Sequence, residues 1–384
     1  MSGPQIKGWC PGALRPMLSG DGWLVRVRPR AGRLTQSQAE GIAMLAARHG
    51  NGLIDLTSRA NLQLRGVRPD SHLALTAGLR ALDLLDDDAV AEARRNLVVT
   101  PFWAAGDDTL GIACSLADAL TASEAPDLPG KFGFAVDCGE SAVLRSTSAD
   151  IRIERGPCGL IVRADGYATG AQVAAHEAVP AAMELARWFA ASEGVQRERL
   201  RRSTPKPRLP ARFEVALGLP PSAAPARVGA VACGWVVGAE FGQLRADKLA
   251  ELARLGPLRI TPWRMVLIEG ASAAPELAGL IADANDPLLR VVACGGAPSC
   301  LQGAAATRPL ARALAAHVAL GQLLHVSGCA KGCAYPLDTL TVVATPAGFD
   351  LVRHGKACST PDLRAVSPEA LAFHLKPRAH AAPL

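Results

Sequence analysis

Four of the ten cysteines stand in two close pairs near the C-terminal end of the 384-residue sequence. Cys294 and Cys300 form C-x5-C, and Cys329 and Cys333 form C-x3-C further along the chain. Four thiolates on two short loops satisfy the ligand demand of a 4Fe-4S cluster, in which each iron takes one cysteine sulfur. A spacing of five is unusual for structural zinc, so zinc is the weaker alternative and four thiols without a metal is the third.

Small residues inside the two loops favour the cluster. Gly295, Gly296 and Pro298 keep the first loop out of a helix, and Gly328 and Gly332 let the second backbone pass close to inorganic sulfide. The other six cysteines stand alone in the sequence. In a reducing compartment such cysteines remain thiols, so we expect no disulfide framework.

The elements that must position these loops occur twice along the chain. Residues 32–50 and 242–256 each predict a helix with apolar residues at three- and four-residue spacing and a glycine stop. A strand-like segment precedes and follows each helix. Three further blocks match in the same order: 94–106 with 289–300, 131–140 with 323–336, and 159–168 with 348–357. We therefore predict two homologous halves, each pairing a small αβ unit with a larger one.

Only the second half carries the paired cysteines. At the corresponding places the first half has Thr100, Gly106 and an unpaired Cys138. A repeat that keeps metal ligands in one copy indicates a pseudo-twofold body with one active site.

Composition and charge exclude several classes of protein. Hydrophobic residues make up 49% and charged residues 20%, which excludes a disordered chain. The net charge of +6 is accounted for by residues 197–212, with seven basic residues and one acidic residue. We interpret this proline-rich stretch as a solvated linker, and a surface that attracts an acidic substrate is the alternative. Aromatic residues make up only 4%, which argues against nucleic-acid binding.

No segment has the apolar length of a membrane span, and the start of the sequence lacks the pattern of a secretory signal. We therefore expect a cytoplasmic protein without a membrane partner.

The paired cysteines in a twice-repeated αβ chain resemble the sulfite and nitrite reductase family, whose members carry a 4Fe-4S cluster next to siroheme. The resemblance implies that Cys294, Cys300, Cys329 and Cys333 bind the cluster. It also implies an α+β, internally duplicated fold, each half a ferredoxin-like αβ unit plus a larger αβ domain. The expected boundaries are 1–75 and 76–205 for the first repeat, 206–226 for the linker, and 227–275 and 276–384 for the second repeat.

Two segments of the first half resemble the family's tetrapyrrole-binding strands. LTSRANLQLRGV, from Leu56, is similar to T-x-R-Q-x-x-Q and retains Arg59 and Gln63. WLVRVRP, from Trp23, is similar to the segment whose arginines face the heme pocket, which makes Arg26 and its neighbour Arg28 candidates. The resemblance thus implies tetrapyrrole binding by these four residues.

Two further segments resemble the family's substrate-binding motifs. RRNLVVT places Arg95 at a second pocket arginine, and LPGKFGF places Lys131 at the first of two lysines that bind the anionic substrate. We assign catalytic roles to both. The second lysine is replaced by Gly133, and the glutamine after Arg59 by Ala60. Sulfite reduction needs several cations around a small anion, so these departures argue against it.

The opening segment 8–34 and the short chain without a flavoprotein module are most similar to the precorrin-3B synthase branch of the family. These are oxygen-dependent monooxygenases of cobalamin (vitamin B12) biosynthesis, which hydroxylate precorrin-3A and form a lactone before ring contraction. Precorrin-3A is a tetrapyrrole with eight carboxylates, so its pocket needs arginines that pair with acetate and propionate groups.

The same branch implies dioxygen as co-substrate and a mononuclear non-heme iron beside the cluster. Two His and one carboxylate are the typical ligands of such an iron. His176-Glu177 is not part of H-E-x-x-H, and His325, four residues before Cys329, is only a weak candidate. The iron ligands therefore stay unassigned. No G-x-G-x-x-G follows an expected strand, so we expect an external electron donor such as an NAD(P)H-linked reductase.

Two other functions remain open at the level of sequence. A siroheme-dependent assimilatory sulfite or nitrite reductase on the same fold predicts a heme-type visible band. An iron–sulfur electron-transfer protein would need no polycarboxylate pocket, so it leaves the arginines of the first half unexplained.

Overall fold

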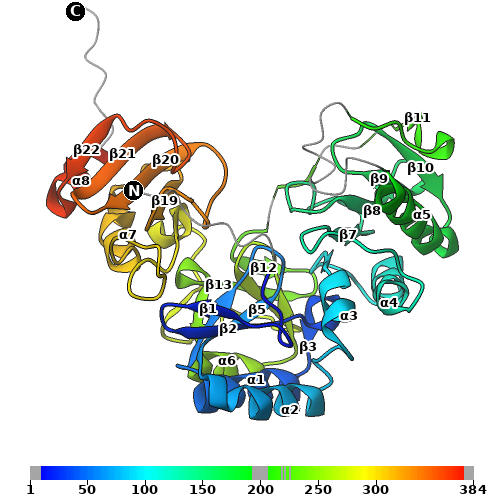
Figure 1. Ribbon diagram of the computed structural model, residues 1–384, viewed down its shortest axis with the longest axis horizontal. Coiled ribbons are helices and arrows are strands. Elements are labelled where there is room, and N and C mark those ends of the chain that lie inside the picture. The colour runs from blue at the N-terminus through cyan, green and yellow to red at the C-terminus, as the bar shows by residue number, and fades with distance from the viewer. Residues whose placement is uncertain (1–9, 193–205, 218, 220–221, 225, 376–384) are drawn as a thin grey trace, which may run out of the picture. The chain divides into compact units, whose positions relative to one another are not determined.

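The computed structural model describes residues 10–192, 206–217, 219, 222–224 and 226–375. The described chain forms two compact units (Figure 1). The larger contains residues 10–17 and 23–282, and the smaller contains residues 18–22 and 283–375. Within the described ranges, no helix combines the length and apolar character that crossing a bilayer requires.

Two small sheets are built from the same series of elements, once in each half of the chain. In the first half these are β1 (Met17–Ser19), β2 (Gly22–Val27), β3 (Arg33–Leu34), α1 (Gln36–His49), β4 (Leu53–Leu56) and β5 (Leu62–Val67). In the second half they are β12 (Gly229–Val231), β13 (Gly234–Ala239), β14 (Gln243–Arg245), α6 (Ala246–Ala253), β15 (Leu258–Ile260) and β16 (Met265–Glu269). These two sets, with their sheets, are called the ferredoxin-like pair below.

The third strand of each set pairs with the sheet of the other half. The strand orders are β1-β2-β5-β4-β14 and β12-β13-β16-β15-β3. β14 runs antiparallel to β4, and β3 runs antiparallel to β15. Each small sheet is therefore complete only with a strand from the other half, so the two halves are interlocked by backbone hydrogen bonds.

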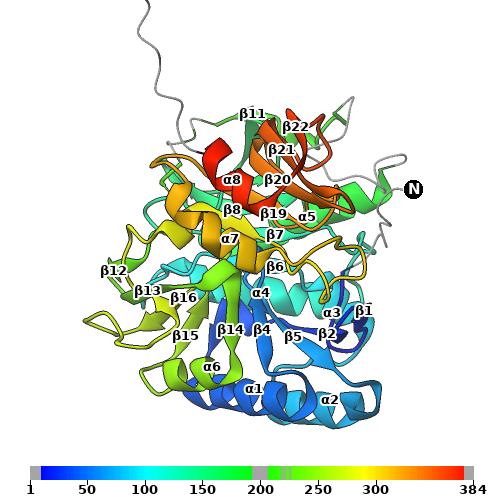
Figure 2. The same ribbon diagram turned by 90° about the vertical axis from the view of Figure 1, so that its left-hand side faces the viewer.

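Helices cover one face of the ferredoxin-like pair. α1 begins with a capping box, in which the Thr35 hydroxyl accepts the Gln38 N–H and the Gln38 side chain accepts the Thr35 N–H. Its buried residues include Ala39, Ile42 and Ala46, which lie on one face at helical spacing. Figure 2 shows α1 between α6 and α2 (His72–Ala81), all on the same side of the strands.

The first αβ domain follows the first small sheet. Its elements are α3 (Ala89–Arg94), β6 (Leu97–Val99), α4 (Asp108–Thr121), β7 (Phe134–Asp137), β8 (Ile151–Gly156), β9 (Gly159–Ala164), β10 (Thr169–Val173), α5 (Ala178–Ala191) and β11 (Val215–Ala216). The strand order is β11-β10-β9-β8-β7-β6. β6, β7 and β8 are parallel, and β9 and β10 return antiparallel. Phe134, Ile151 and Ile153 bury one face against residues of α4 and α5 such as Leu116 and Phe189.

The second αβ domain lies in the smaller unit. Its elements are β18 (Val291–Ala293), α7 (Arg308–Leu314), β19 (Leu324–Ser327), β20 (Thr339–Thr345), β21 (Gly348–Gly355), β22 (Leu363–Val366) and α8 (Pro368–Leu375). The strand order is β18-β19-β20-β21-β22. β18, β19 and β20 are parallel, and β21 and β22 are antiparallel.

The two αβ domains therefore share strand order and strand direction, and each is preceded by an equivalent small sheet. The prediction of an internally duplicated α+β fold is confirmed. The blocks matched in the sequence coincide with equivalent elements, because β6 corresponds to β18, β7 to β19 and β9 to β21.

The structure places some elements differently from the expected domain boundaries. Helix α2 (His72–Ala81) spans the expected boundary at residue 75. Part of the expected linker belongs to the first αβ domain, because β11 pairs with β10 and Phe213 is fully buried. The long segment of the smaller unit begins at Asp283, whereas the expected boundary is at residue 276, since β17 (Leu280–Ile281) pairs with β13. Most of the basic stretch, up to residue 205, lies outside the described residues.

Candidate active site

The four cysteines predicted to bind a cluster lie in the loops that follow β18 and β19. These strands are adjacent and parallel, with Ala293 beside Val326, so both loops leave the sheet at the same edge. Backbone hydrogen bonds tie the loops together, since Ala304 N donates to Gly328 O at 2.8 Å and Cys294 N donates to Val326 O at 3.3 Å. The paired strands thus bring cysteines 294, 300, 329 and 333 to one region of the second αβ domain.

Glycine makes the close approach of the two loops possible. A Cβ atom at Gly328 would lie 3.0 Å from Gly296 Cα and 3.5 Å from Cys294 Sγ. Gly328 N donates a hydrogen bond to Cys294 Sγ at 3.1 Å. Backbone N–H donors to cysteine sulfur are typical of iron–sulfur sites, where they help to set the reduction potential. The second loop therefore supplies both the space and the donor that such a site needs.

The thiols lie close enough to act on one another. Partial removal of water from the Cys333 thiol, and the charges of Cys329, Cys294 and Cys300, raise the pKa of Cys333, while Lys331 opposes this shift. A tetranuclear cluster neutralises such mutual repulsion by binding each thiolate to a different iron. The donor set, the loop spacing and the N–H···S bond thus fit a 4Fe-4S cluster.

Among the described residues, no group of three or more His, Cys, Asp or Glu side chains is arranged to hold a single metal ion. A cubane separates its four ligating sulfurs more widely than one ion does, so this finding bears on the mononuclear iron and on zinc rather than on the cluster. His325, the weak iron candidate, is fully buried on β19, with its ring centroid 6.2 Å from that of Tyr335. The ligands of a mononuclear iron stay unassigned.

Arg26 and Gln63 stand opposite each other on β2 and β5. Arg26 Nη2 donates to Gln63 Oε1 at 3.1 Å. Burial lowers the pKa of Arg26, and the neighbouring Cys10 thiol and Glu92 carboxylate oppose this shift. Arg26 Nε is buried and has no hydrogen-bond acceptor among the described residues. Because an unsatisfied buried donor is costly, this nitrogen is suited to an incoming acceptor.

Arg28 and Arg95 form a second, more deeply buried group. Arg95 binds Asp86 with two hydrogen bonds of 2.7 and 2.8 Å and donates to Arg28 O at 3.0 Å. The Arg28 guanidinium donates through Nη1 to Glu92 O, while its Nε has no acceptor among the described residues. Burial lowers the pKa of Arg28, Glu92 raises it, and Arg26 and Arg95 lower it further. Three arginines therefore share one buried region with two carboxylates.

Arg59 and Lys131, the two remaining candidate residues, contact each other. Arg59 lies in the turn between β4 and β5, and its Nη2 donates to Lys131 O at 2.9 Å. Lys131 is exposed three residues before β7, and within the described ranges its ammonium makes no ion pair. The structure therefore brings the six candidates together in two groups: Arg26, Gln63, Arg28 and Arg95 in one, and Arg59 with Lys131 in the other.

Gly133 occupies the place of the family's second lysine. Asn96 Nδ2 donates to Phe132 O at 2.7 Å and packs against the glycine. A Cβ atom at Gly133 would lie only 2.9 Å from Asn96 Nδ2 and 3.1 Å from Asn96 O. The packing here leaves no room for a side chain, so the fold excludes a second lysine at this position.

Three residues of this region escaped the sequence interpretation: Cys10, Asp86 and Glu92. The Glu92 carboxylate accepts hydrogen bonds from Ala13 N at 2.5 Å and Leu14 N at 3.1 Å, which fixes the segment that carries Cys10. A Cβ atom at Gly12 would clash with this carboxylate. The C-P-G sequence at residues 10–12 was the available signal, because glycine is needed at such a close approach.

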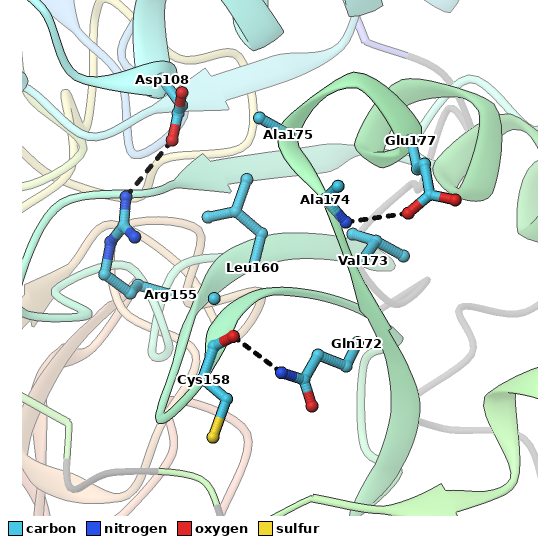
Figure 3. A pocket seen from close by; sticks show the side chains of 10 residues that line it. Asp108, Arg155, Cys158, Leu160, Gln172, Val173, Ala174, Ala175 and Glu177 are labelled. Carbon is cyan, nitrogen blue, oxygen red and sulfur yellow. Dashed lines mark hydrogen bonds and ion pairs between the residues drawn. The ribbon is translucent and has the colours of Figure 1, made fainter.

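A shallow hollow of about 410 Å³ lies elsewhere, at the end of β8 in the first αβ domain (Figure 3). Arg155 there donates to Cys138 O at 2.8 Å and pairs with Asp108 at 3.5 Å. None of the predicted site residues lines it, and its arginine is already engaged. We therefore place the candidate site at the arginine groups rather than at this hollow.

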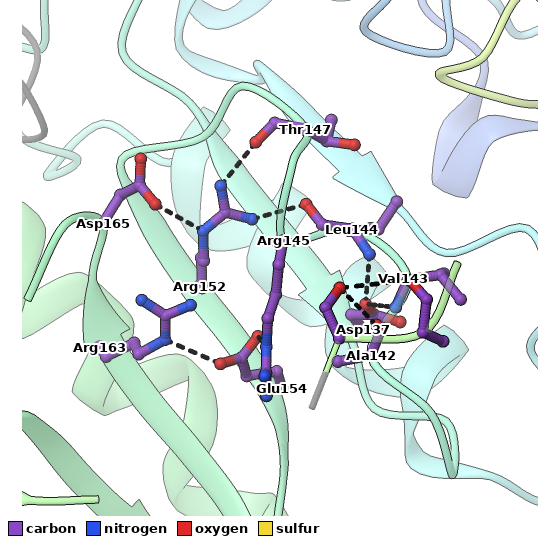
Figure 4. Close-up of polar contacts among 12 residues, drawn as sticks. Asp137, Ala142, Val143, Leu144, Arg145, Thr147, Arg152, Glu154, Arg163 and Asp165 are labelled. Carbon is purple, nitrogen blue, oxygen red and sulfur yellow. Dashed lines mark hydrogen bonds and ion pairs between the residues drawn. The ribbon is translucent and has the colours of Figure 1, made fainter. Parts of the chain in front are cut away.

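A buried ionic network supports the sheet of the first αβ domain (Figure 4). Arg152, 1% exposed, donates to Asp165 and to the carbonyl oxygens of Leu144 and Thr147. Glu154 accepts hydrogen bonds from Arg163 and Arg145. Since these charges satisfy one another and a loop backbone, the network has a structural role.

Comparison with known proteins agrees with this fold. A family model described as "Nitrite/Sulfite reductase ferredoxin-like half domain" matches residues 15–82. The structure of Mycobacterium tuberculosis NirA protein superimposes with a TM-score of 0.61 at 16% identity, covering 92% of this chain and 79% of that one. A ferredoxin–nitrite reductase of Synechococcus elongatus is 28% identical over 197 residues, 48% of this chain and 37% of that protein.

The duplicated fold and the matched half domain define a nitrite/sulfite reductase-like fold. A precorrin-3B synthase of Sinorhizobium sp is 30% identical over 394 aligned residues, covering 92% of this chain and 84% of that protein. The chain belongs to the precorrin-3B synthase family. It is an enzyme of the oxidoreductase class.

Proposed function

We propose that the protein catalyses the oxygen-dependent conversion of precorrin-3A to precorrin-3B in cobalamin biosynthesis. The observation that carries this proposal is the precorrin-3B synthase relative, which the chain matches over most of both lengths. The reaction hydroxylates the tetrapyrrole and closes a lactone before the ring contracts.

The arginine groups supply the chemistry that a polycarboxylate macrocycle needs. The Nε atoms of Arg26 and Arg28 are buried without acceptors among the described residues, and a substrate carboxylate would satisfy them. Guanidinium groups bind carboxylates through paired, charge-assisted hydrogen bonds. Gln63 orients Arg26, and Arg59 approaches from the β4–β5 turn. The proposed tetrapyrrole-binding residues are thus Arg26, Arg28, Arg59 and Gln63.

The two residues predicted to be catalytic differ in what they can reach. Lys131 is exposed, so in this proposal its ammonium contacts an anionic group of the substrate. Arg95 is 6% exposed and held by Asp86, and it donates to Arg28 O. Its proposed contribution is therefore to hold Arg28 in place.

The proposed resident cofactor is a 4Fe-4S cluster bound by Cys294, Cys300, Cys329 and Cys333. When bound, such a cluster supplies electrons one at a time. A mononuclear non-heme iron, dioxygen and an external donor, an NAD(P)H-linked reductase, complete the proposal. In this proposal the arginines bind the macrocycle, and two glycine-rich loops position the four cysteine thiolates that bind the cluster.

The decisive experiment is purification under anaerobic conditions, followed by iron and labile-sulfide analysis and a visible spectrum. We expect four irons per cluster plus one further iron, with no heme band, and turnover of precorrin-3A in the presence of dioxygen and a reductant. Absence of inorganic sulfide, or absence of hydroxylated product with intact cluster, would contradict the proposal.

A siroheme-dependent sulfite or nitrite reductase is the second candidate, favoured by the half-domain match and the nitrite reductase relative. A heme-type band in the purified protein would support it. Gly133 opposes it, because the packing of Asn96 excludes the second lysine that would bind the small anion.

A further inference from the structure

The loop after β6 in the first αβ domain docks on the second half of the ferredoxin-like pair. Phe102 stacks on Trp263, with ring centroids 6.0 Å apart and planes inclined by 17°. The Arg259 guanidinium lies over the Trp103 ring, with its central carbon 3.4 Å from the ring centroid. Two consecutive aromatic residues thus attach this loop to β15 and to the turn that follows it.

Arg259 makes more contacts with the loop than the ring stack alone. Its Nη1 donates to Pro101 O at 2.8 Å and to Trp103 O at 2.7 Å. Its Nε donates to Glu269 Oε1 at 2.6 Å. Arg33 binds both oxygens of Glu269 at 2.8 Å, so the carboxylate that orients Arg259 is itself fixed by a residue of the other half. A cation that is stacked, hydrogen-bonded and 6% exposed is held in one orientation.

The opposite end of the same strands is attached to the first half. β6 contains only three residues, and Arg95 just before it donates to Arg28 O. Three residues before the neighbouring strand β7, Lys131 O accepts the hydrogen bond from Arg59. The first half therefore holds the chain at the starts of β6 and β7, next to the predicted catalytic residues. The second half holds the loop at the far end of β6.

The two attachments use the same local structure. The Thr57 hydroxyl accepts the N–H groups of Arg59 and Asn61, and the Thr261 hydroxyl accepts those of Trp263 and Met265. Arg59 and Trp263 hence occupy matching places in equivalent turns, one touching the chain before β7 and the other the loop after β6.

We propose that Arg259 is a positioning residue of the tetrapyrrole site, acting through the Trp103 loop and β6 on Arg95 and Lys131. The inference rests on the proposed function, because it concerns the same site. Without Arg259 the loop loses the cation stacked on Trp103 and two hydrogen bonds, so the far end of β6 keeps only the Phe102–Trp263 stack as its aromatic attachment. A shift of β6 would displace Arg95, and through the pairing of β6 with β7 also Lys131, relative to Arg26, Arg28 and Arg59.

The test measures binding of uroporphyrin III, a stable tetrapyrrole with eight carboxylates, to the full-length protein with its cluster. R259A should bind it about tenfold to a hundredfold more weakly, because small displacements of positioned groups have effects of this size. The visible spectrum and the iron and sulfide content should not change. R259K should recover part of the affinity, since lysine keeps a cation over the indole and can still donate to a carbonyl oxygen.

R155A is the matched control, because Arg155 also donates to a backbone carbonyl of the first αβ domain but contacts only that domain in the described structure. Its affinity should equal that of the wild type. Failure of the wild-type protein to bind uroporphyrin III would overturn the proposed function itself.

Equal binding by R259A and wild type would overturn the positioning role alone. So would a loss in R259A accompanied by loss of cluster or by an equal loss in R155A, because that pattern indicates general unfolding. If R259A does not fold, the single variants R259K and W103F carry the test, because each changes one partner of the Arg259–Trp103 stack. Wild-type affinity in both would overturn the proposal.

Discussion

The loops that follow the first parallel strand of the two αβ domains occupy the same place in the same topology but contain different residues. In the second domain, the loop after β18 carries Cys294 and Cys300. In the first, the loop after β6 has Thr100 in place of Cys294 and carries Phe102 and Trp103, which contact Trp263 and Arg259. Where the thiols are absent, the loop attaches the domain to the ferredoxin-like pair.

A second difference explains why only one half can hold this loop. β4 and β5 carry the pair Asp55–Arg65 at 2.7 Å, whereas the equivalent positions of β15 and β16 carry Arg259–Glu269 at 2.6 Å. The order of charges is reversed between the halves. The Arg259 guanidinium donates to the carbonyl oxygens of Pro101 and Trp103, whereas the carboxylate at the equivalent position of the first half can only accept. Duplication thus gave two equal scaffolds, and exchange of a few polar residues gave them separate tasks.

The largest expected effect comes from Cys294→Ser, which tests whether the loop after β18 binds a cluster. Serine is a poor ligand for iron in such a cluster, so we expect loss of labile sulfide, of the visible charge-transfer absorption and of turnover. Cys358→Ser, at an exposed cysteine of the same domain, is the control and should retain all three. Unchanged iron and sulfide content in Cys294→Ser would show that the loop after β18 does not bind a cluster, and the proposed difference from the loop after β6 would be lost.

A smaller effect is expected for Arg59→Ala in the first half. Loss of a charge-assisted hydrogen bond costs about 1.5–3 kcal/mol, so the Michaelis constant for precorrin-3A should rise about 10- to 100-fold. Steady-state kinetics at saturating dioxygen measures this change, with Arg155→Ala as the control. An unchanged Michaelis constant would show that the β4–β5 turn does not face the substrate.

Gly133→Ala sharpens the comparison between this chain and the anion reductases. The new methyl group would lie 2.9 Å from Asn96 Nδ2, so we expect a loss of about 1–3 kcal/mol in the free energy of unfolding. Gly130→Ala is the matched control, since a Cβ atom there has nothing within 4 Å. Urea denaturation of both variants measures the difference. Equal stability of the two variants would show that the structure can accommodate a side chain at position 133, and therefore that the fold does not exclude a lysine there.

The last prediction concerns stability as a function of pH. Burial raises the pKa of Asp137 to about 6, although hydrogen bonds from Leu144 N and Val143 N oppose the shift. The favourable contribution of the protonated carboxyl is complete below about pH 4 and is lost as the pH rises through 6. Asp137→Asn keeps an acceptor without the charge, so its stability relative to wild type should increase between pH 4 and 7, by at most about 3 kcal/mol.

Thermal unfolding across this pH range tests the Asp137 prediction, and enzyme activity should not change because Asp137 lies in the structural network of Figure 4. A stability difference that is constant with pH would show that the carboxyl is charged at no cost in the folded protein.

Sequence patterns were sufficient for the parts of this protein that depend on near neighbours. The helices from Gln36 and Ala246 follow from apolar periodicity, and the cysteine loops follow from spacing and glycine content. The duplication was visible because each half repeats the same order of local patterns. The resemblance of short motifs also selected arginines that the structure gathers into two groups.

The contacts between distant segments were not accessible in the same way. The exchange of β3 and β14 pairs strands from opposite halves, and nothing in a two- or three-residue strand specifies its partner. The full engagement of Arg95 by Asp86 was also missed, because a motif gives the residue type but not its partner.

The order of elements, the four thiols and the cationic residues of the first half are written in the amino-acid sequence, because residue type, spacing and periodicity act over a few positions. Folding in three dimensions decided which cation is available and which is already neutralised, where Gly133 forbids a side chain, and that Arg259 holds a loop more than 150 positions away. Those outcomes depend on burial and hydrogen-bond geometry, which exist only once distant segments have packed together.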